Sequence, residues 1–163
     1  MKKGLCLFLV LCMFLSGCSV SADRRKETAS FYYLRTEYQY GHQDGVIVIE
    51  ERDLSGHRDS LSYLLALYLV GPMKDGLVCP LPKGTRIYSA EQGPNGISLK
   101  LSDTLGSLTD ADFSLACACL TLTCLNLTDS DSVTITSGSR SVTMTRDSLT
   151  LCDGNTAETE ETQ

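Results

Sequence analysis

Near the start of the chain, a cysteine follows a short apolar run after two small residues. Two lysines precede an apolar run over residues 4–15, and the small residues Ser16 and Gly17 lead directly into Cys18. A basic segment, a short apolar segment and a small-residue cleavage site are the parts of a secretory signal peptide. In bacterial lipoprotein precursors a cysteine follows that site. We therefore expect cleavage between Gly17 and Cys18, so that residues 1–17 take no part in the fold.

Cys18 is the expected lipidation site, because only a thiol forms the thioether that carries a diacylglyceryl group. One acyl chain binds a membrane reversibly, whereas two fatty chains such as palmitate hold a protein stably. The expected location is the outer leaflet of the cytoplasmic membrane, with the protein on the extracytoplasmic face. The alternative is an ordinary cleaved signal and a secreted, unanchored protein.

The chain that remains after cleavage has 146 residues and room for one domain. Its net charge falls from -6 to -8 when the two signal lysines are lost. This acidic balance argues against nucleic acid as a partner and against a charge-driven contact with an anionic membrane. Residues 18–30 are polar and predict a lipidated N-terminus with a solvated tether. Residues 153–163 predict a disordered acidic tail, which leaves 31–152 as the domain.

One helix is predicted more clearly than any other element. Apolar residues recur at the spacing of one helical face at five positions: Leu61, Leu64, Leu65, Tyr68 and Leu69. Gly71 and Pro72 end this helix, because proline cannot continue it.

A second helix is predicted to begin at Thr109, where Asp112 follows in a capping-box-like arrangement. Its apolar residues form two stripes: Phe113, Ala116, Cys117, Leu120 and Cys124, and then Leu115, Cys119 and Leu122. A helix that is apolar on two sides lies at the centre of a core or presents one side to a partner.

Three pairs of strands are predicted from β-branched and alternating residues, each pair around a turn signal: 31–34 with 46–50, 86–90 with 97–101, and 133–136 with 141–145. The order is ββ-α-ββ-α-ββ. It predicts an α+β fold in which a single antiparallel or mixed sheet of about four to six strands packs against two helices.

Five cysteines follow Cys18 in the chain: Cys79, Cys117, Cys119, Cys124 and Cys152. Because five is odd, at least one thiol stays free. The chain has no Cys-x-x-Cys pair and no histidine at ligand spacing, so we expect buried apolar side chains and no metal. A redox role is the weakest of the alternatives.

Residues suited to catalysis are scarce. The chain has none of the serine-elbow, zinc-protease, phosphate-loop or dinucleotide motifs, and its two histidines, His42 and His57, lie in polar segments. Glu50, Glu51 and Asp53 cluster after a strand and are the best candidates for an acid pair. We expect no catalytic site. The alternative is an envelope hydrolase or small-ligand-binding lipoprotein that uses these acids or His57.

Several short segments resemble the GerMN domain of spore germination and sporulation lipoproteins. The matching landmarks run in order from about Phe31 to Leu151: Leu64-Leu65 to Gly71-Pro72, Leu81-Pro82-Lys83-Gly84-Thr85-Arg86-Ile87, Gly96 to Ser102, Leu120-Thr121-Leu122-Thr123, and Ser132 to Ile135. Their order and spacing carry the resemblance. We interpret all of them as scaffold, because each has a physical reason in a turn, a helix end or an alternating strand.

The resemblance implies a GerMN fold, similar to the ring-building domains of envelope complexes, with no catalytic residues and no cofactor. It implies a lipoprotein that contacts envelope proteins, sporulation proteins or peptidoglycan during envelope assembly, sporulation or germination. The expected contact surfaces are the edges of the sheet and a face of the second predicted helix, which begins at Thr109.

Overall fold

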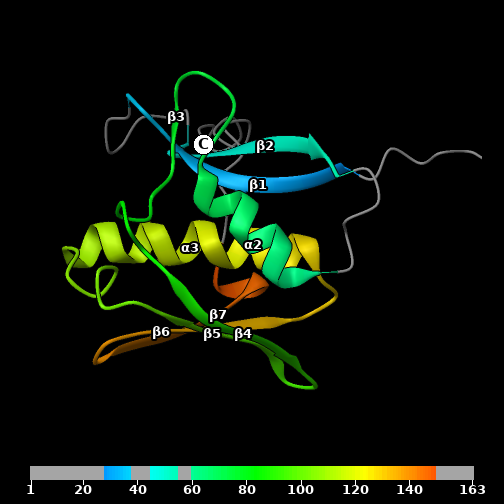
Figure 1. Cartoon of the computed structure of the whole chain (residues 1–163), viewed down its shortest axis with the longest axis vertical. Coiled ribbons are helices and arrows are strands. Elements are labelled where there is room, and N and C mark those ends of the chain that lie inside the picture. The colour runs from blue at the N-terminus through cyan, green and yellow to red at the C-terminus, as the bar shows by residue number, and fades with distance from the viewer. Residues whose placement is uncertain (1–27, 38–44, 55–59, 150–163) are drawn as a thin grey trace, which may run out of the picture.

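A long helix lies between two β-sheets, and a shorter helix packs beside it (Figure 1). The computed structural model describes residues 28–37, 45–54 and 60–149. The elements in chain order are β1 (Thr28–Arg35), β2 (Ile47–Asp53), α2 (Leu61–Val70), β3 (Leu77–Val78), β4 (Ile87–Gly93), β5 (Gly96–Leu101), α3 (Asp110–Leu127), β6 (Ser132–Ser137), β7 (Arg140–Thr145) and a 3-10 turn (Arg146–Ser148). The α+β class, both predicted helices and all three pairs of strands are confirmed.

The strands form two sheets, so the expected single sheet is wrong. One sheet has the order β2-β1-β3 and is antiparallel, and the other has the order β4-β5-β6-β7 with β5 and β6 parallel. The helix α3 makes the crossover between β5 and β6. Two sheets form because α3 is apolar on two sides, and one sheet could cover only one of them.

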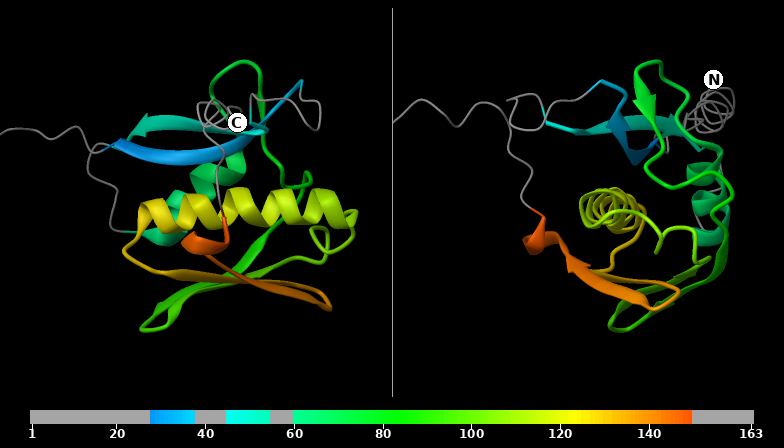
Figure 2. Two further views of the ribbon diagram at one scale, coloured as in Figure 1. Left: turned by 180° about the vertical axis from the view of Figure 1, so that it is seen from behind. Right: turned by 90° about the vertical axis from the view of Figure 1, so that its left-hand side faces the viewer.

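The central helix α3 is buried along most of its length, and Figure 2 shows it end-on between the sheets. Its stripe with Phe113 and Leu120 belongs to the main core, whereas Cys119 and Leu122 pack on Tyr32 and Leu34 of β1. The helix is long and apolar enough to span a membrane, but 67% of it is buried inside the domain. The second stripe is therefore core, and the expected contact surface on this helix is wrong.

Two threonines of α3 differ in how their buried hydroxyls are satisfied. Thr123 Oγ1 donates to the carbonyl of Cys119 at 2.8 Å and accepts from the backbone N–H of Tyr32 at 3.0 Å. It thereby joins α3 to β1. Thr121 Oγ1 is equally buried but has no hydrogen-bond partner among the described residues.

Valine at these two positions is expected to change stability in opposite directions. Thr123→Val leaves the Tyr32 N–H unpaired and should lower the free energy of unfolding by about 1–3 kcal/mol. Thr121→Val removes an unpaired buried hydroxyl at nearly constant volume and should raise that free energy by up to about 1 kcal/mol. Urea unfolding of both variants measures the difference. Equal destabilisation by both would contradict the hydrogen bonding described above.

The landmark around Pro82 is a turn fixed by hydroxyl groups. Thr85 donates through both its backbone N–H and its Oγ1 to the carbonyl of Pro82, and Gly84 has a φ of 86°. Thr104 Oγ1 bonds to the hydroxyls of Thr85 and Ser102. These contacts make Pro82, Gly84 and Thr85 parts of the scaffold.

The boundaries differ from the prediction at one end of the domain. The strand β1 begins at Thr28, and Ala29 is only 2% exposed, so residues 28–30 belong to the fold rather than to the tether. The strand β3 has two residues, too few for a periodic signal, and was not predicted. Cys18, Cys152, the signal segment and the acidic tail lie outside the described residues.

Candidate functional site

The acidic residues expected to form a pair lie on opposite faces of β2. Side chains alternate along a strand, so Glu50 is buried whereas Glu51 and Asp53 are exposed. The Glu50 and Glu51 side chains therefore do not face each other as an acid pair would. The two histidines, His42 and His57, lie outside the described residues.

Glu50 is 1% exposed, and donors surround its carboxylate. The Nε of Arg52, two positions along the same face of β2, donates to Oε1. The backbone N–H of Met73 donates at 2.9 Å and that of Lys74 at 2.9 Å to Oε2. The carboxylate thus holds the segment that follows α2, where the Gly71-Pro72 landmark lies.

Arg52 caps the C-terminal end of α2. Its guanidinium donates to the carbonyls of Leu67 at 3.3 Å and Gly71 at 2.6 Å, and to the hydroxyl of Tyr33 at 3.0 Å. It also lies over the ring of Phe31, 4.8 Å from the centroid. A cation at a helix C-terminus satisfies carbonyls that have no partner within the helix. The charged pair therefore fastens α2 to the sheet.

The pKa values in this network follow from burial and hydrogen bonding. Burial acts to raise the pKa of Glu50, but the hydrogen bonds from the Lys74 N–H, Arg52 and the Met73 N–H outweigh burial, and the net pKa is lowered. Burial raises the pKa of the Tyr33 hydroxyl, although Arg52 opposes it. Glu50 therefore stays ionised at neutral pH and is unsuited to act as a general acid there.

The stabilisation from Glu50 should disappear in acid. Because its folded pKa is below the ordinary value of 4.5, its contribution is fully present above that value and is lost as the pH falls through the folded pKa. The difference in unfolding free energy between wild type and Glu50→Gln should be constant near neutral pH and shrink below pH 4.5. Urea titrations at several pH values measure it. A pH-independent difference would contradict the assigned pKa, and exposed Glu51→Gln serves as the control.

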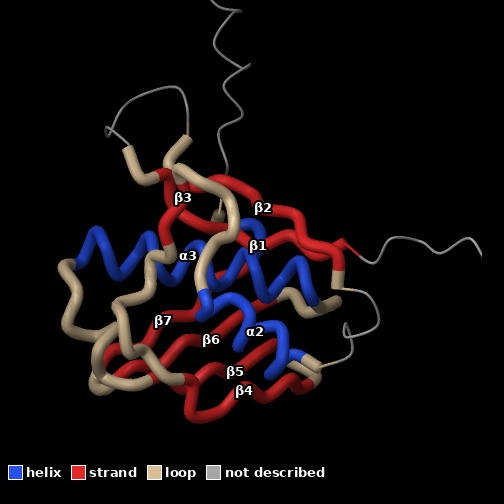
Figure 3. Tube along the Cα trace, turned by 45° about the horizontal axis from the view of Figure 1, so that its top comes forward, coloured by secondary structure: helices blue, strands red, loops and turns tan. Residues whose placement is uncertain are grey.

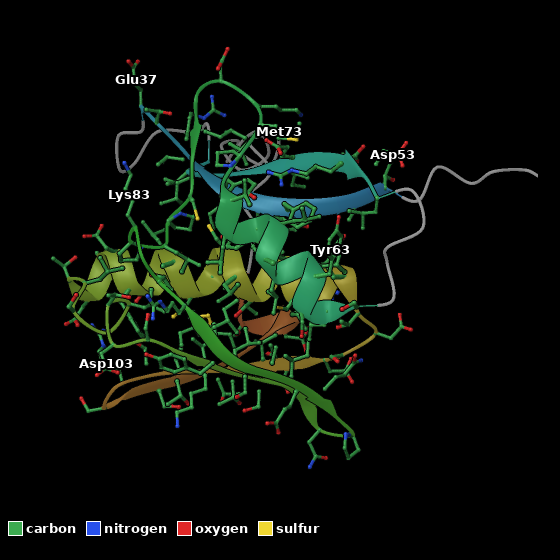
Figure 4. The ribbon with its side chains drawn as sticks, in the orientation of Figure 1. Glu37, Asp53, Tyr63, Met73, Lys83 and Asp103 are labelled. Carbon is green, nitrogen blue, oxygen red and sulfur yellow. The ribbon has the colours of Figure 1, made fainter. Side chains whose placement is uncertain are left out.

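A groove of about 530 Å³ borders this network on the surface. Its lining combines the β2 acids with residues of α2 and the following segment: Glu50, Glu51, Arg52, Asp53, Leu54, Tyr63, Leu67, Met73 and Lys74. Figure 4 shows Asp53 at the end of β2 above Tyr63, and Met73 beyond the other end of α2. Two of these lining residues, Glu50 and Arg52, are engaged in hydrogen bonds within the fold.

The described cysteines are free and mostly buried. Burial raises the pKa of Cys117 to about 12, despite Arg140, and that of Cys124 to about 12. Burial also raises the pKa of Cys79 and Cys119. A thiolate is the reactive form, so these four residues are poorly suited to redox chemistry. No group of three or more His, Cys, Asp or Glu in the described ranges is placed to hold a metal ion.

The predicted scaffold residues lie where the fold needs them. Gly71 is the C-cap of α2, with a φ of 99°, and donates its N–H to the Tyr68 carbonyl. The segment 120–123 is buried in α3. The Glu50–Arg52 pair was not predicted, although two opposite charges at positions i and i+2 of a strand lie on one face and are a usable signal.

No family model and no curated protein sequence matches the chain. Its fold is similar to the first GerMN domain of the sporulation protein GerM from Bacillus subtilis, with a TM-score of 0.53 at 18% identity over 71% of this chain and 85% of that one. The tandem GerMN domains of GerM give a TM-score of 0.48 at 18% identity, covering 69% of this chain and 39% of that one. A candidate lipoprotein from Clostridium perfringens gives 0.47 at 16% identity, covering 74% and 87%.

The first of these matches agrees with the fold expected from the sequence landmarks. Helix α2 ending at Gly71, the turn at Pro82, the strand from Gly96 and the central helix through Leu120 occupy the places that the landmark order predicts. The chain therefore has the fold of a GerMN domain.

Proposed function

We propose that this chain is an extracytoplasmic lipoprotein, anchored through Cys18, whose GerMN domain is a non-catalytic interaction module. Its partners are envelope or sporulation proteins, or peptidoglycan, and it acts in envelope assembly, sporulation or germination. The signal segment and Cys18 support the anchor, and the GerMN fold supports the module. The similar domain in Bacillus subtilis belongs to a sporulation protein, which favours the same setting.

The hydrogen bonds of the Glu50 carboxylate support the proposal that the module is non-catalytic. The buried member of the candidate acids, Glu50, is held by Arg52 and by the backbone N–H groups of Met73 and Lys74, and these contacts join β2 to the segment after α2. A group whose proton affinity is lowered in this way serves the fold rather than acid catalysis. This engagement of Glu50 removes one of the candidate residues, Glu50, Glu51, Asp53 and His57, on which the envelope-hydrolase alternative rests.

The available contact surfaces lie at the edges of the sheets. The order of the four-stranded sheet leaves β4 and β7 at its edges, and Figure 3 shows these strands on the side away from β1. The edge of a sheet offers unpaired backbone groups to a partner. We place the protein contacts of the module there.

Crosslinking in membranes, followed by purification of the full-length protein, tests this proposal. Wild type and Cys18→Ala are compared, and the co-purifying proteins and glycan fragments are identified. Envelope or sporulation components recovered only with the anchored form would support the proposal. Recovery of no partner with either form, or turnover that is lost in Glu50→Gln, would contradict it.

A further inference from the structure

The exposed side of α2 carries no charge and, apart from Ser62, is apolar although it faces solvent. Leu61–Val70 contains no charged residue. Tyr63 is 42% exposed, Val70 is 83% exposed, and Met73, just beyond the helix, is 81% exposed. With Ala66, which is also exposed, these residues form what we call the α2 apolar face. Large apolar side chains grouped on one surface mark a contact site.

One end of this face, at Tyr63, lies near the point at which the chain leads back toward Cys18. Thr28, the first residue of β1, pairs with Asp53, and Asp53 lines the same groove as Tyr63. Only nine residues lie between Cys18 and Thr28, so ten residue steps join them. A fully extended chain of ten residues spans at most about 36 Å. An anchored domain is thus confined to a layer comparable to its own size above the bilayer.

We propose that the α2 apolar face rests on the lipid bilayer that holds the acyl anchor. This inference rests on the proposed lipidation of Cys18. The short tether creates a high effective concentration of lipid, so that a weak apolar contact is sufficient. Val70 and Met73 enter the acyl boundary, and Tyr63 lies at the headgroup level, where amphipathic rings are stable.

The charges near the face favour an apolar rather than an electrostatic contact. Glu51 and Asp53 lie in the adjoining groove and disfavour anionic headgroups, whereas Lys74 follows Met73 and can reach a phosphate. These three groups leave a net negative charge beside the face, so electrostatic attraction to an anionic bilayer does not hold the contact. The contact should therefore persist at high salt, unlike a contact made by a basic patch.

Spin labels in the lipidated protein test this contact. The full-length protein is purified from membranes and reconstituted into vesicles of phosphatidylethanolamine and phosphatidylglycerol. A nitroxide is placed at Val70→Cys or, as the control, at exposed Thr143→Cys on β7, and the unsubstituted protein gives the background from its own cysteines. Collision rates with oxygen and with an aqueous nickel chelate report depth.

The Val70 label should lose nickel collisions and gain oxygen collisions in vesicles, at low and high salt, while the Thr143 label stays aqueous. Two aqueous labels on a protein that floats with the vesicles would overturn the inference and leave the anchor intact. A third outcome is a Val70 label that is shielded from both oxygen and nickel, to a degree that rises with the number of protein molecules per vesicle. That result would indicate a second copy of the protein on the α2 apolar face and would overturn the proposed lipid contact. A protein without lipid that does not float would defeat the anchor itself.

Discussion

Arg52→Met is expected to lower the free energy of unfolding by about 3–5 kcal/mol, because it leaves Glu50 as a buried charge without its ion-pair partner. The substitution also removes the donors that cap Leu67 and Gly71 at the end of α2. Methionine keeps most of the side-chain volume, so the loss reports hydrogen bonds and charge rather than a cavity. Urea unfolding of the unlipidated mature chain measures it.

Two further variants make this test specific. Glu51→Gln changes an exposed acid of the same strand and should alter stability by no more than about 0.5 kcal/mol. The double variant Glu50→Gln with Arg52→Met should lose less unfolding free energy than the sum of the two single variants. Both charges are absent from the double variant, so no buried charge is left without its partner. Additive losses, or an Arg52→Met protein as stable as Glu51→Gln, would show that the pair does not hold α2.

Gly96→Ala is expected to cost about 2–5 kcal/mol through backbone strain and overpacking. Gly96 has a φ of 120°, and an added Cβ would lie 2.5 Å from the carbonyl oxygen of Ser132. Ser132 begins β6, so the clash falls where β5 and β6 run side by side. Thermal unfolding of the variant measures the loss.

Gly84→Ala is the matched control for this prediction. Gly84 also has a positive φ, 86°, but an added Cβ would meet nothing within 4 Å. It should therefore cost only the strain of the left-handed backbone, about 1–2 kcal/mol. If Gly84→Ala were as destabilising as Gly96→Ala, the close approach of β5 and β6 would not be the cause.

Local patterns predicted the elements, but they did not predict how the strands divide between sheets. The stripe from Leu61 to Leu69 and the cap at Thr109 are local signals, and both helices form where they predict. The parallel pairing of β5 with β6 and the separate sheet around β1 depend on contacts across α3. The two apolar stripes of α3 were the sequence signal for two sheets, because each stripe must be buried against a different sheet.

The candidate site also depends on contacts between residues that are far apart in the chain, which local sequence patterns do not predict. Glu50, Glu51 and Asp53 are adjacent in the chain, and their adjacency suggested an acid pair. The strand alternation turns Glu50 inward, and its main-chain partners at Met73 and Lys74 lie more than twenty residues away. A pattern of charges along the sequence cannot reveal such distant donors.

The mass of the N-terminal peptide of the mature protein shows whether Cys18 carries the lipid anchor. Protein from the membrane fraction is digested, and the peptide that contains Cys18 is identified. We expect a peptide that begins at Cys18 and carries a diacylglyceryl group on its thiol. A peptide that retains Gly17, or one that begins after Cys18, or an unmodified thiol at Cys18, would contradict the anchor and with it the placement of the domain at the membrane.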